Sequence, residues 1–239
     1  MTWSIVARDA RTGAFGVAIA TKFFAVGALC PHVESGVGAL STQALVNPMY
    51  GPKGLALLRA GVPAAEVVPR LIGDDEGRDF RQVHVIDAKG GLAQHTGSKC
   101  VEWCGHVAHK NFSVAGNMLA GARVVEDTAA AFAANGALPF AERLIAAMQA
   151  GDAAGGDKRG RQSAALLVYS TDDYPDLDIR VDDHETPLVE LKRLYEKAHE
   201  RFIPYLACAP TRARPSGELD RPTIDAAIAR HASTRAARK

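Results

Sequence analysis

Two nearly continuous apolar runs open the chain, at residues 2–8 and 14–21. A short polar stretch that contains Gly13 separates them. Two such runs around a short glycine-containing turn are typical of a β-hairpin. Because the second run is apolar almost throughout and does not alternate with polar residues, we expect the hairpin to be buried on both faces.

Later runs predict further strands and helices. Strands are predicted at residues 35–43, 81–87, 92–95, 111–116, 163–170 and 177–181. Helices are predicted at residues 52–60, 63–72, 122–135, 138–150 and 187–206. Hairpins separated by helix pairs, without strict alternation of strand and helix, favour a layered α+β sandwich.

The C-terminal stretch, residues 207–239, has a different pattern. It contains three prolines and few apolar residues, and its seven Lys and Arg against three Asp and Glu leave a local charge of +4. Such a composition supports little packed structure. We therefore predict one folded domain over residues 1–206 and a flexible basic tail over 207–239, with at most one short helix near 222–231.

Composition and charge narrow the class of protein. The 239 residues are 47% hydrophobic and 23% charged, with a net charge of +1 and 6% aromatic residues. The composition is typical of a globular domain, and neither the charge nor the aromatic content suggests nucleic acid as a partner. No apolar run reaches the roughly 18 residues that cross a bilayer. The chain also opens without a secretory signal, so we expect no membrane partner and a cytoplasmic location.

Several segments carry a family resemblance. They are MTWSIVARD at 1–9, GVAIATKFFAVGA at 16–28, STQALVNPMYGPKGL at 41–55, AQHTGSKC at 93–100, GNMLAG at 116–121, AGGDKRGRQSAALLV at 154–168 and RVDDH at 180–184. They resemble the bacterial family called domain of unknown function 1028, which is similar to N-terminal-nucleophile (Ntn) hydrolases. The resemblance implies a four-layer αββα sandwich, with two stacked, mainly antiparallel sheets between helical layers. Because Ntn folds often oligomerise, it also implies a homo-oligomer.

An Ntn hydrolase uses its first residue as the nucleophile, and residue 2 here is Thr2. Removal of Met1 would leave Thr2 at the start of a buried strand, with a free α-amine. That amine would act as the base, since its unperturbed pKa is about 7.7–8.0. A rigid strand would present the hydroxyl and the amine together. Thr2 is therefore the predicted nucleophile, with an ordinary strand-starting residue after an initiator methionine as the alternative interpretation.

The resemblance implies three further catalytic residues. Lys22, after the second strand, would lower the proton affinity of the nucleophile, and Asp157 would tune it as well. Asn117, between a strand and a helix, would face the developing oxyanion. A solvated lysine and a simple turn residue are the alternative interpretations of Lys22 and Asn117.

The polar loop at residues 155–163 precedes a predicted core strand. Arginine suits the recognition of carboxylates, so we expect this loop to touch an anionic group of a substrate, with salt bridges or a subunit interface as the alternatives. The predicted substrate-binding residues are Thr42, Gln43, Arg161, Gln162 and Ser163.

Two clusters resemble metal sites but are interpreted otherwise. The first consists of Cys100, Cys104, His106 and His109. Its histidine spacing does not match common zinc patterns, so we predict an edge hairpin. The second, DDH at 182–184, is interpreted as the cap of the following helix. P-loop, dinucleotide and Gly-x-Ser-x-Gly motifs are absent from the sequence, so no cofactor is expected.

Two functions stay open from the sequence. The first is an Ntn-type amidohydrolase that acts on a small amide or carbamoyl metabolite. The second is a catalytically inactive Ntn-like protein that binds a small metabolite or has a structural or regulatory role. The expected partner is a small-molecule substrate or ligand, and the low aromatic content argues mildly against a large aromatic one.

Overall fold

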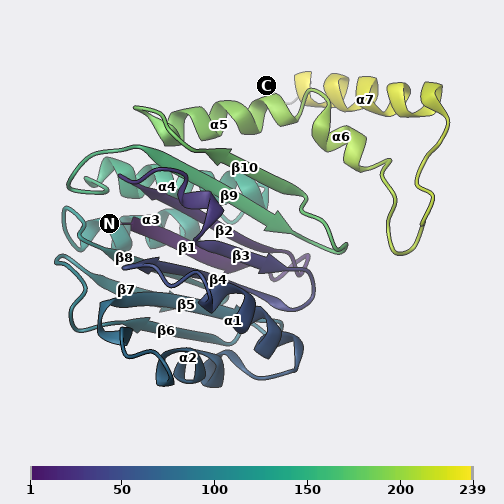
Figure 1. Cartoon of the computed structure of the whole chain (residues 1–239). Helices are drawn as coiled ribbons and strands as arrows, with labels where there is room; N and C mark the ends of the chain where they lie inside the picture. The colour runs from purple at the N-terminus through teal and green to yellow at the C-terminus, as the bar shows by residue number, and fades with distance from the viewer. Residues whose placement is uncertain (1, 238–239) are drawn as a thin grey trace. The chain divides into compact units, whose positions relative to one another are not determined.

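The computed structural model describes residues 2–237, and these residues form an α+β structure with two antiparallel sheets (Figure 1). The chain divides into two compact units, the first ending at Leu191 and the second beginning at Lys192. The first unit contains both sheets. The predicted boundary at residue 206 therefore lies within the second unit.

The larger sheet has six strands in the order β10–β9–β2–β1–β8–β7. Their bounds are β1 Thr2–Arg8, β2 Phe15–Thr21, β7 Gly105–His109, β8 Phe112–Asn117, β9 Ser163–Tyr169 and β10 Leu177–Val181. The predicted hairpin is β1 and β2, at the centre of this sheet, and both strands are buried along almost their whole length. The apolar runs therefore correspond to strands covered on both faces.

The smaller sheet has four strands in the order β3–β4–β5–β6. Their bounds are β3 Pro31–Glu34, β4 Gly38–Ala44, β5 Arg81–Asp87 and β6 Leu92–Thr96. β1 contacts β4 and β5, so the two sheets face each other. One face of each sheet is thus buried against the other sheet.

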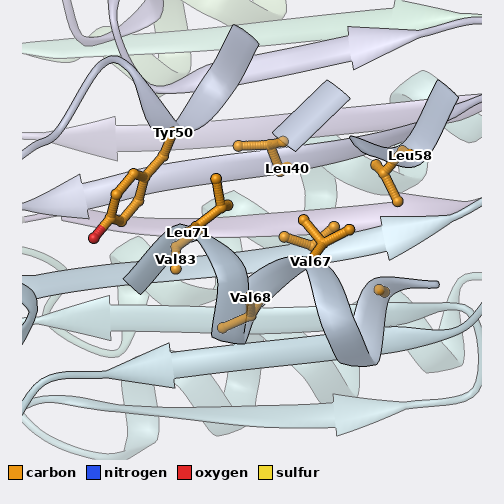
Figure 2. Close-up of a cluster of buried hydrophobic side chains, with 9 residues drawn as sticks. Leu40, Tyr50, Leu58, Val67, Val68, Leu71 and Val83 are labelled. Carbon is orange, nitrogen blue, oxygen red and sulfur yellow. The ribbon is translucent and has the colours of Figure 1, made fainter. Parts of the chain in front are cut away.

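Four helices pack against the two sheets. Helices α1 (Tyr50–Arg59) and α2 (Ala64–Gly73) contact the four-stranded sheet, whereas α3 (Arg123–Ala134) and α4 (Phe140–Ala153) contact the six-stranded sheet. Figure 2 shows the first of these contacts. The side chains that meet there are Tyr50, Leu58, Val67, Val68 and Leu71 from the helices and Leu40 and Val83 from the sheet.

Two helix predictions need correction. The helix predicted at 187–206 is broken into α5 (Pro187–Ala198) and α6 (Phe202–Leu206). Pro204 gives a reason, because it has no amide hydrogen to donate to the carbonyl of Glu200 and its ring would clash with that carbonyl in a continuous helix. Further on, α7 covers Arg221–Ala236 and is longer than the helix predicted at 222–231. Its first turn is capped by Asp220, whose side chain accepts a hydrogen bond from the Thr223 backbone N–H at 3.0 Å.

The layer between the sheets changes from apolar to polar along the strands. We call one part the apolar end; its buried residues are Val6, Phe15, Val17, Val33, Ala39 and Ile86. We call the other part the polar end; its buried residues are Thr2, Ser4, Gln43, Gln82, His84, Ser113 and Asn117. Since alternate residues of a strand face the same side, β1 contributes Val6 to one end and Ser4 and Thr2 to the other.

Candidate functional site

A cavity of about 190 Å³ opens at the polar end, with Thr2 and Gln43 in its wall; we call it the Thr2 cavity. Thr2 is only 6% exposed. Its Oγ1 donates a hydrogen bond to Oγ1 of Thr21, the last residue of β2, at 3.2 Å. On the other side Thr2 pairs with Asn117 of β8. Neighbouring strands on both sides therefore fix the position of the Thr2 hydroxyl.

The rest of the Thr2 cavity is apolar apart from Arg159. The apolar side chains in its wall are Phe23, Val26, Leu29, Cys30, Ala44, Leu45 and Val46. Burial raises the pKa of the Cys30 thiol to about 12, so the thiol is uncharged at neutral pH. An apolar wall with a few convergent polar groups is the usual composition of a small-molecule site.

Two side-chain amides, those of Gln43 and Asn117, contact the Thr2 carbonyl, and the Gln82 amide links them. Gln43 Nε2 donates to Gln82 Oε1 at 2.8 Å and to the Ala115 carbonyl at 3.2 Å, and the Thr2 carbonyl lies 3.4 Å from it. Asn117 Nδ2 donates to Gln82 Oε1 at 3.0 Å and lies 3.4 Å from the Thr2 carbonyl. Backbone carbonyls only accept hydrogen bonds, so they fix which end of each amide is the nitrogen.

A directional hydrogen-bond chain supports Gln43. Ser4 Oγ donates its only proton to Gln43 Oε1 at 2.6 Å. His84 Nε2, 2.8 Å from Ser4 Oγ, must therefore donate to Ser4, and Nδ1 must accept from Ser113 Oγ at 2.7 Å. Burial lowers the pKa of His84 to about 3, and the nearby His106 acts in the same direction. His84 is thus a neutral Nε2–H tautomer at physiological pH.

Asp157 connects the Thr2 cavity to the polar loop. Its buried carboxylate accepts hydrogen bonds from the Lys22 backbone N–H at 2.7 Å and from the Arg159 backbone N–H at 2.9 Å. It also pairs with the Arg159 guanidinium at 3.2 Å. Asp157 therefore holds Arg159 at the edge of the cavity and fixes the chain directly after Thr21.

Three of the predicted site residues line a different pocket, of about 560 Å³. Lys22 Nζ donates to the Arg161 carbonyl at 3.2 Å. The Arg161 guanidinium pairs with Asp152 at 2.7 Å, and Gln162 Nε2 donates to Asp183 Oδ1 at 3.0 Å. The Lys22, Arg161 and Gln162 side chains are therefore brought together with Asp183, in a pocket whose wall does not include Thr2.

Thr42 and Ser163 hold loops rather than line the Thr2 cavity. Thr42 Oγ1 donates to the Asn47 carbonyl at 3.2 Å. Ser163 Oγ donates to the Phe23 carbonyl at 2.6 Å and accepts from the Val26 N–H at 3.1 Å. Because Phe23 and Val26 belong to the cavity wall, Ser163 shapes the cavity through the backbone.

Comparison with known proteins identifies the family. The family model described as "Family of unknown function (DUF1028)" matches residues 2–191, the same C-terminal limit as the first compact unit. The chain belongs to the DUF1028 family. No curated protein matches its sequence.

Solved structures similar to this DUF1028 chain include a member of the same family and a more distant protein. The crystal structure of a DUF1028 protein from Silicibacter pomeroyi has 33% sequence identity and a TM-score of 0.85, with 92% of this chain and 96% of that chain covered. Anbu (ancestral beta-subunit) from Yersinia bercovieri has 12% identity and a TM-score of 0.40, with 82% of this chain and 94% of that chain covered. The high TM-score of the first pair shows that the two family members share their fold.

Five residues of the DUF1028 site were not among those predicted from the sequence: Ser4, Thr21, Gln82, His84 and Arg159. Gln82 and His84 alternate with valines in the run RQVHVID, and both are fully buried. The available signal was the recurrence of polar residues at alternate positions near one end of several strands. Alternation of this kind usually marks a solvated face, whereas here a second sheet covers it.

The described residues contain no group of three or more His, Cys, Asp or Glu that could hold a metal ion. The Cys100–His109 segment forms edge strand β7 and its approach, and His106 Nδ1 lies 2.9 Å from Thr96 Oγ1. None of the helices within residues 2–237 is both long and apolar enough to cross a membrane.

Proposed function

We propose that this DUF1028 protein is an Ntn-type amidohydrolase that cleaves a small amide or carbamoyl compound, with Thr2 as the nucleophile. The observation that carries the proposal is the Thr2 hydroxyl, which is held at the start of a central strand and lines a small cavity. The contacts of α1 and α2 with one sheet and of α3 and α4 with the other agree with a four-layer αββα sandwich of the Ntn type.

The proposed reaction requires a free α-amine on Thr2, and Met1, which would have to be removed, lies outside the described residues. Thr2 Oγ1 attacks the amide carbonyl while the α-amine takes the hydroxyl proton. The amine passes this proton to the leaving nitrogen as the carbon–nitrogen bond breaks, which leaves an ester on Thr2. Water then attacks the ester, and the Thr2 oxygen recovers a proton as the carboxylic acid leaves.

Asn117 is the proposed oxyanion donor. Its amide already faces Gln82 Oε1 at 3.0 Å and the Thr2 carbonyl at 3.4 Å. The 3.4 Å contact is the weaker of the two, so the N–H that points at the Thr2 carbonyl is the one that can turn toward a substrate oxygen. Gln43 keeps its contact with the Thr2 carbonyl while Asn117 turns, and Gln82 holds Gln43 in place.

The other predicted residues receive supporting parts in this proposal. Asp157 and the Lys22 backbone position Thr21, whose hydroxyl accepts the hydrogen bond of Thr2. Gln43 contacts the substrate in the Thr2 cavity, and Thr42 and Ser163 hold the neighbouring loops. Arg161 and Gln162 contact only a substrate that extends into the second pocket.

A binding protein without turnover is the second candidate, and the position of Lys22 favours it. Its ammonium group donates to the Arg161 carbonyl and lines the second pocket. A lysine in that place gives Thr2 less electrostatic activation than a lysine beside the hydroxyl would.

Mass spectrometry and a variant pair separate the two candidates. The intact mass of the purified chain reports whether Met1 is present, and a retained Met1 contradicts the amine-as-base mechanism. If Met1 is removed, release of amine from a panel of small amides should disappear in Thr2→Ala and persist in part in Thr2→Ser. Thr234→Ala, on exposed helix α7, serves as the control. Undiminished turnover by Thr2→Ala contradicts the assignment of Thr2.

A further inference from the structure

We propose, resting on the proposed function, that the substrate is a small amide with one compact apolar group and one carboxylate. The apolar group lies in the Thr2 cavity and the carboxylate lies against Arg159. An N-acylated amino acid with a branched or single-ring acyl group is the simplest compound of this class.

The size of the cavity sets the size of the apolar group. Its volume is about 190 Å³. An apolar cavity of about 150 Å³ in another protein binds benzene, so this one accommodates a single ring or a branched chain of similar size. A long acyl chain exceeds that volume.

The wall of the cavity sets the polarity of the group. The side chains of Phe23, Val26, Leu29 and Val46 present only hydrocarbon to the interior, and burial keeps Cys30 as an uncharged thiol. A charged or strongly hydrated group here would lose water without gaining hydrogen bonds, which is unfavourable. The amide carbonyl, by contrast, meets Thr2 and Gln43 on the polar side of the cavity.

Arg159 supplies the recognition of the carboxylate. Its Nε and Nη2 atoms face Asp157 at 3.4 and 3.2 Å, which fixes the plane of the guanidinium. Its Nη1 has no hydrogen-bond partner among residues 2–237, and the side chain is 42% exposed. A guanidinium held by one carboxylate and open on another edge can bind a second carboxylate through charge-assisted hydrogen bonds.

Binding to the Thr2→Ala variant tests the ligand class apart from turnover. Calorimetric titration compares N-isovaleryl-glycine, N-acetyl-glycine and the uncharged N-isovaleryl-glycine methylamide. We expect the isovaleryl compound to bind at least about tenfold more tightly than the acetyl compound, because it buries additional methyl and methylene groups. We expect about a tenfold loss on removal of the charge. Thr2→Val, which keeps the side-chain shape, replaces Thr2→Ala if that variant does not fold.

Variants on the Thr2→Ala background locate the two contacts. Val46→Phe fills the cavity and should remove the preference for isovaleryl over acetyl. Arg159→Gln should remove the preference for the carboxylate, whereas Arg123→Gln, on the exposed face of α3, should leave it unchanged. If Arg161→Gln, and not Arg159→Gln, removes the preference for the carboxylate, the anion binds in the second pocket and the proposal is overturned.

The outcomes keep the two proposals distinct. Binding in the expected order together with no hydrolysis by the wild-type chain contradicts the proposed function and supports the ligand class. Equal hydrolysis of the acetyl and isovaleryl compounds supports the function and overturns the ligand class. Failure of the Thr2→Ala and Thr2→Val variants to bind any of the three compounds overturns the ligand class as well.

Discussion

Strands β1, β4 and β5 contribute to both the apolar end and the polar end of the inter-sheet layer, but with different side chains at each end. Along β5, Ile86 belongs to the apolar end and His84 and Gln82 to the polar end. All three residues are fully buried. The two ends therefore do not differ in burial along β5; they differ in the chemistry of their side chains.

The two ends contribute to folding in different ways. Burial of an apolar side chain stabilises the fold in rough proportion to its area. A buried polar side chain gains little net stability even when it is fully hydrogen-bonded, and it destabilises the fold when a partner is lost. The polar end is thus a poor means of stabilisation and a good means of holding Thr2 and Gln43 in one geometry, which agrees with a functional role.

The largest effect is expected from the apolar end. Phe15 is 1% exposed and packs in that cluster, so Phe15→Ala should lower the free energy of unfolding by about 3–5 kcal/mol. Urea denaturation followed by circular dichroism measures the change. Ligand affinity at the Thr2 cavity should be nearly unchanged while the protein stays folded, and a large loss of affinity there would show that the two ends do not act separately.

A smaller loss of stability with a larger loss of binding is expected from Gln82→Leu. Gln82 Oε1 accepts from both Gln43 and Asn117, and its Nε2 donates to the Gly116 carbonyl at 2.8 Å. Loss of these bonds leaves several buried groups without partners, at a cost of about 2–4 kcal/mol. The same denaturation experiment gives the stability, and calorimetric titration with N-isovaleryl-glycine gives the affinity. Affinity equal to that of the wild type would rule out a part for Gln82 in holding the site.

Titration of His84, in the polar end, makes the free energy of unfolding depend on pH. Its pKa is about 3 in the folded protein, below the ordinary value of 6.5, so the unfolded chain binds a proton first as the pH falls. The contribution of neutral His84 is complete above pH 6.5 and is lost between about pH 6.5 and 3. The loss is at most about 1.4 kcal/mol per pH unit.

Denaturation at several pH values tests this dependence. His84→Gln should show a shallower decline between pH 6.5 and 4 than the wild type. Phe15→Ala, which removes no titrating group, should decline as steeply as the wild type does. Identical slopes for wild type and His84→Gln would mean that His84 is not held neutral.

The sequence indicates much of the fold but little of the polar end. The β1–β2 hairpin was predictable because its apolar runs reflect burial on both faces. Strand β3 was not predicted, and β7 was expected only as part of an edge hairpin, without strand bounds. Both lie at sheet edges, where fewer positions are buried, so the apolar pattern in their sequences is weak. For Gln82, the covering sheet comes from segments distant in sequence, so local alternation could not distinguish a buried polar row from a solvated one.

The loop at residues 155–163 shows a second limit. Arg159 and Arg161 are chemically alike and two residues apart, yet only Arg159 lines the Thr2 cavity. The loop conformation decides between them, with positive φ angles of 52° at Gly156 and 112° at Gly160. Glycine permits such angles without selecting one arrangement, so the sequence predicts an arginine contact but not which arginine makes it.

The smallest effect is expected at Ser113, the far end of the hydrogen-bond chain. Ser113→Ala removes the donor to His84 Nδ1 and should lower the free energy of unfolding by about 1 kcal/mol. It also removes the bond that stabilises the Nε2–H tautomer, because Nδ1 no longer accepts a hydrogen bond from the Ser113 hydroxyl. ¹⁵N spectra of the imidazole should show an Nε2–H ring in the wild type and a less uniform tautomer in Ser113→Ala. An Nδ1–H ring in the wild type would contradict the direction of the chain through Ser4 to Gln43.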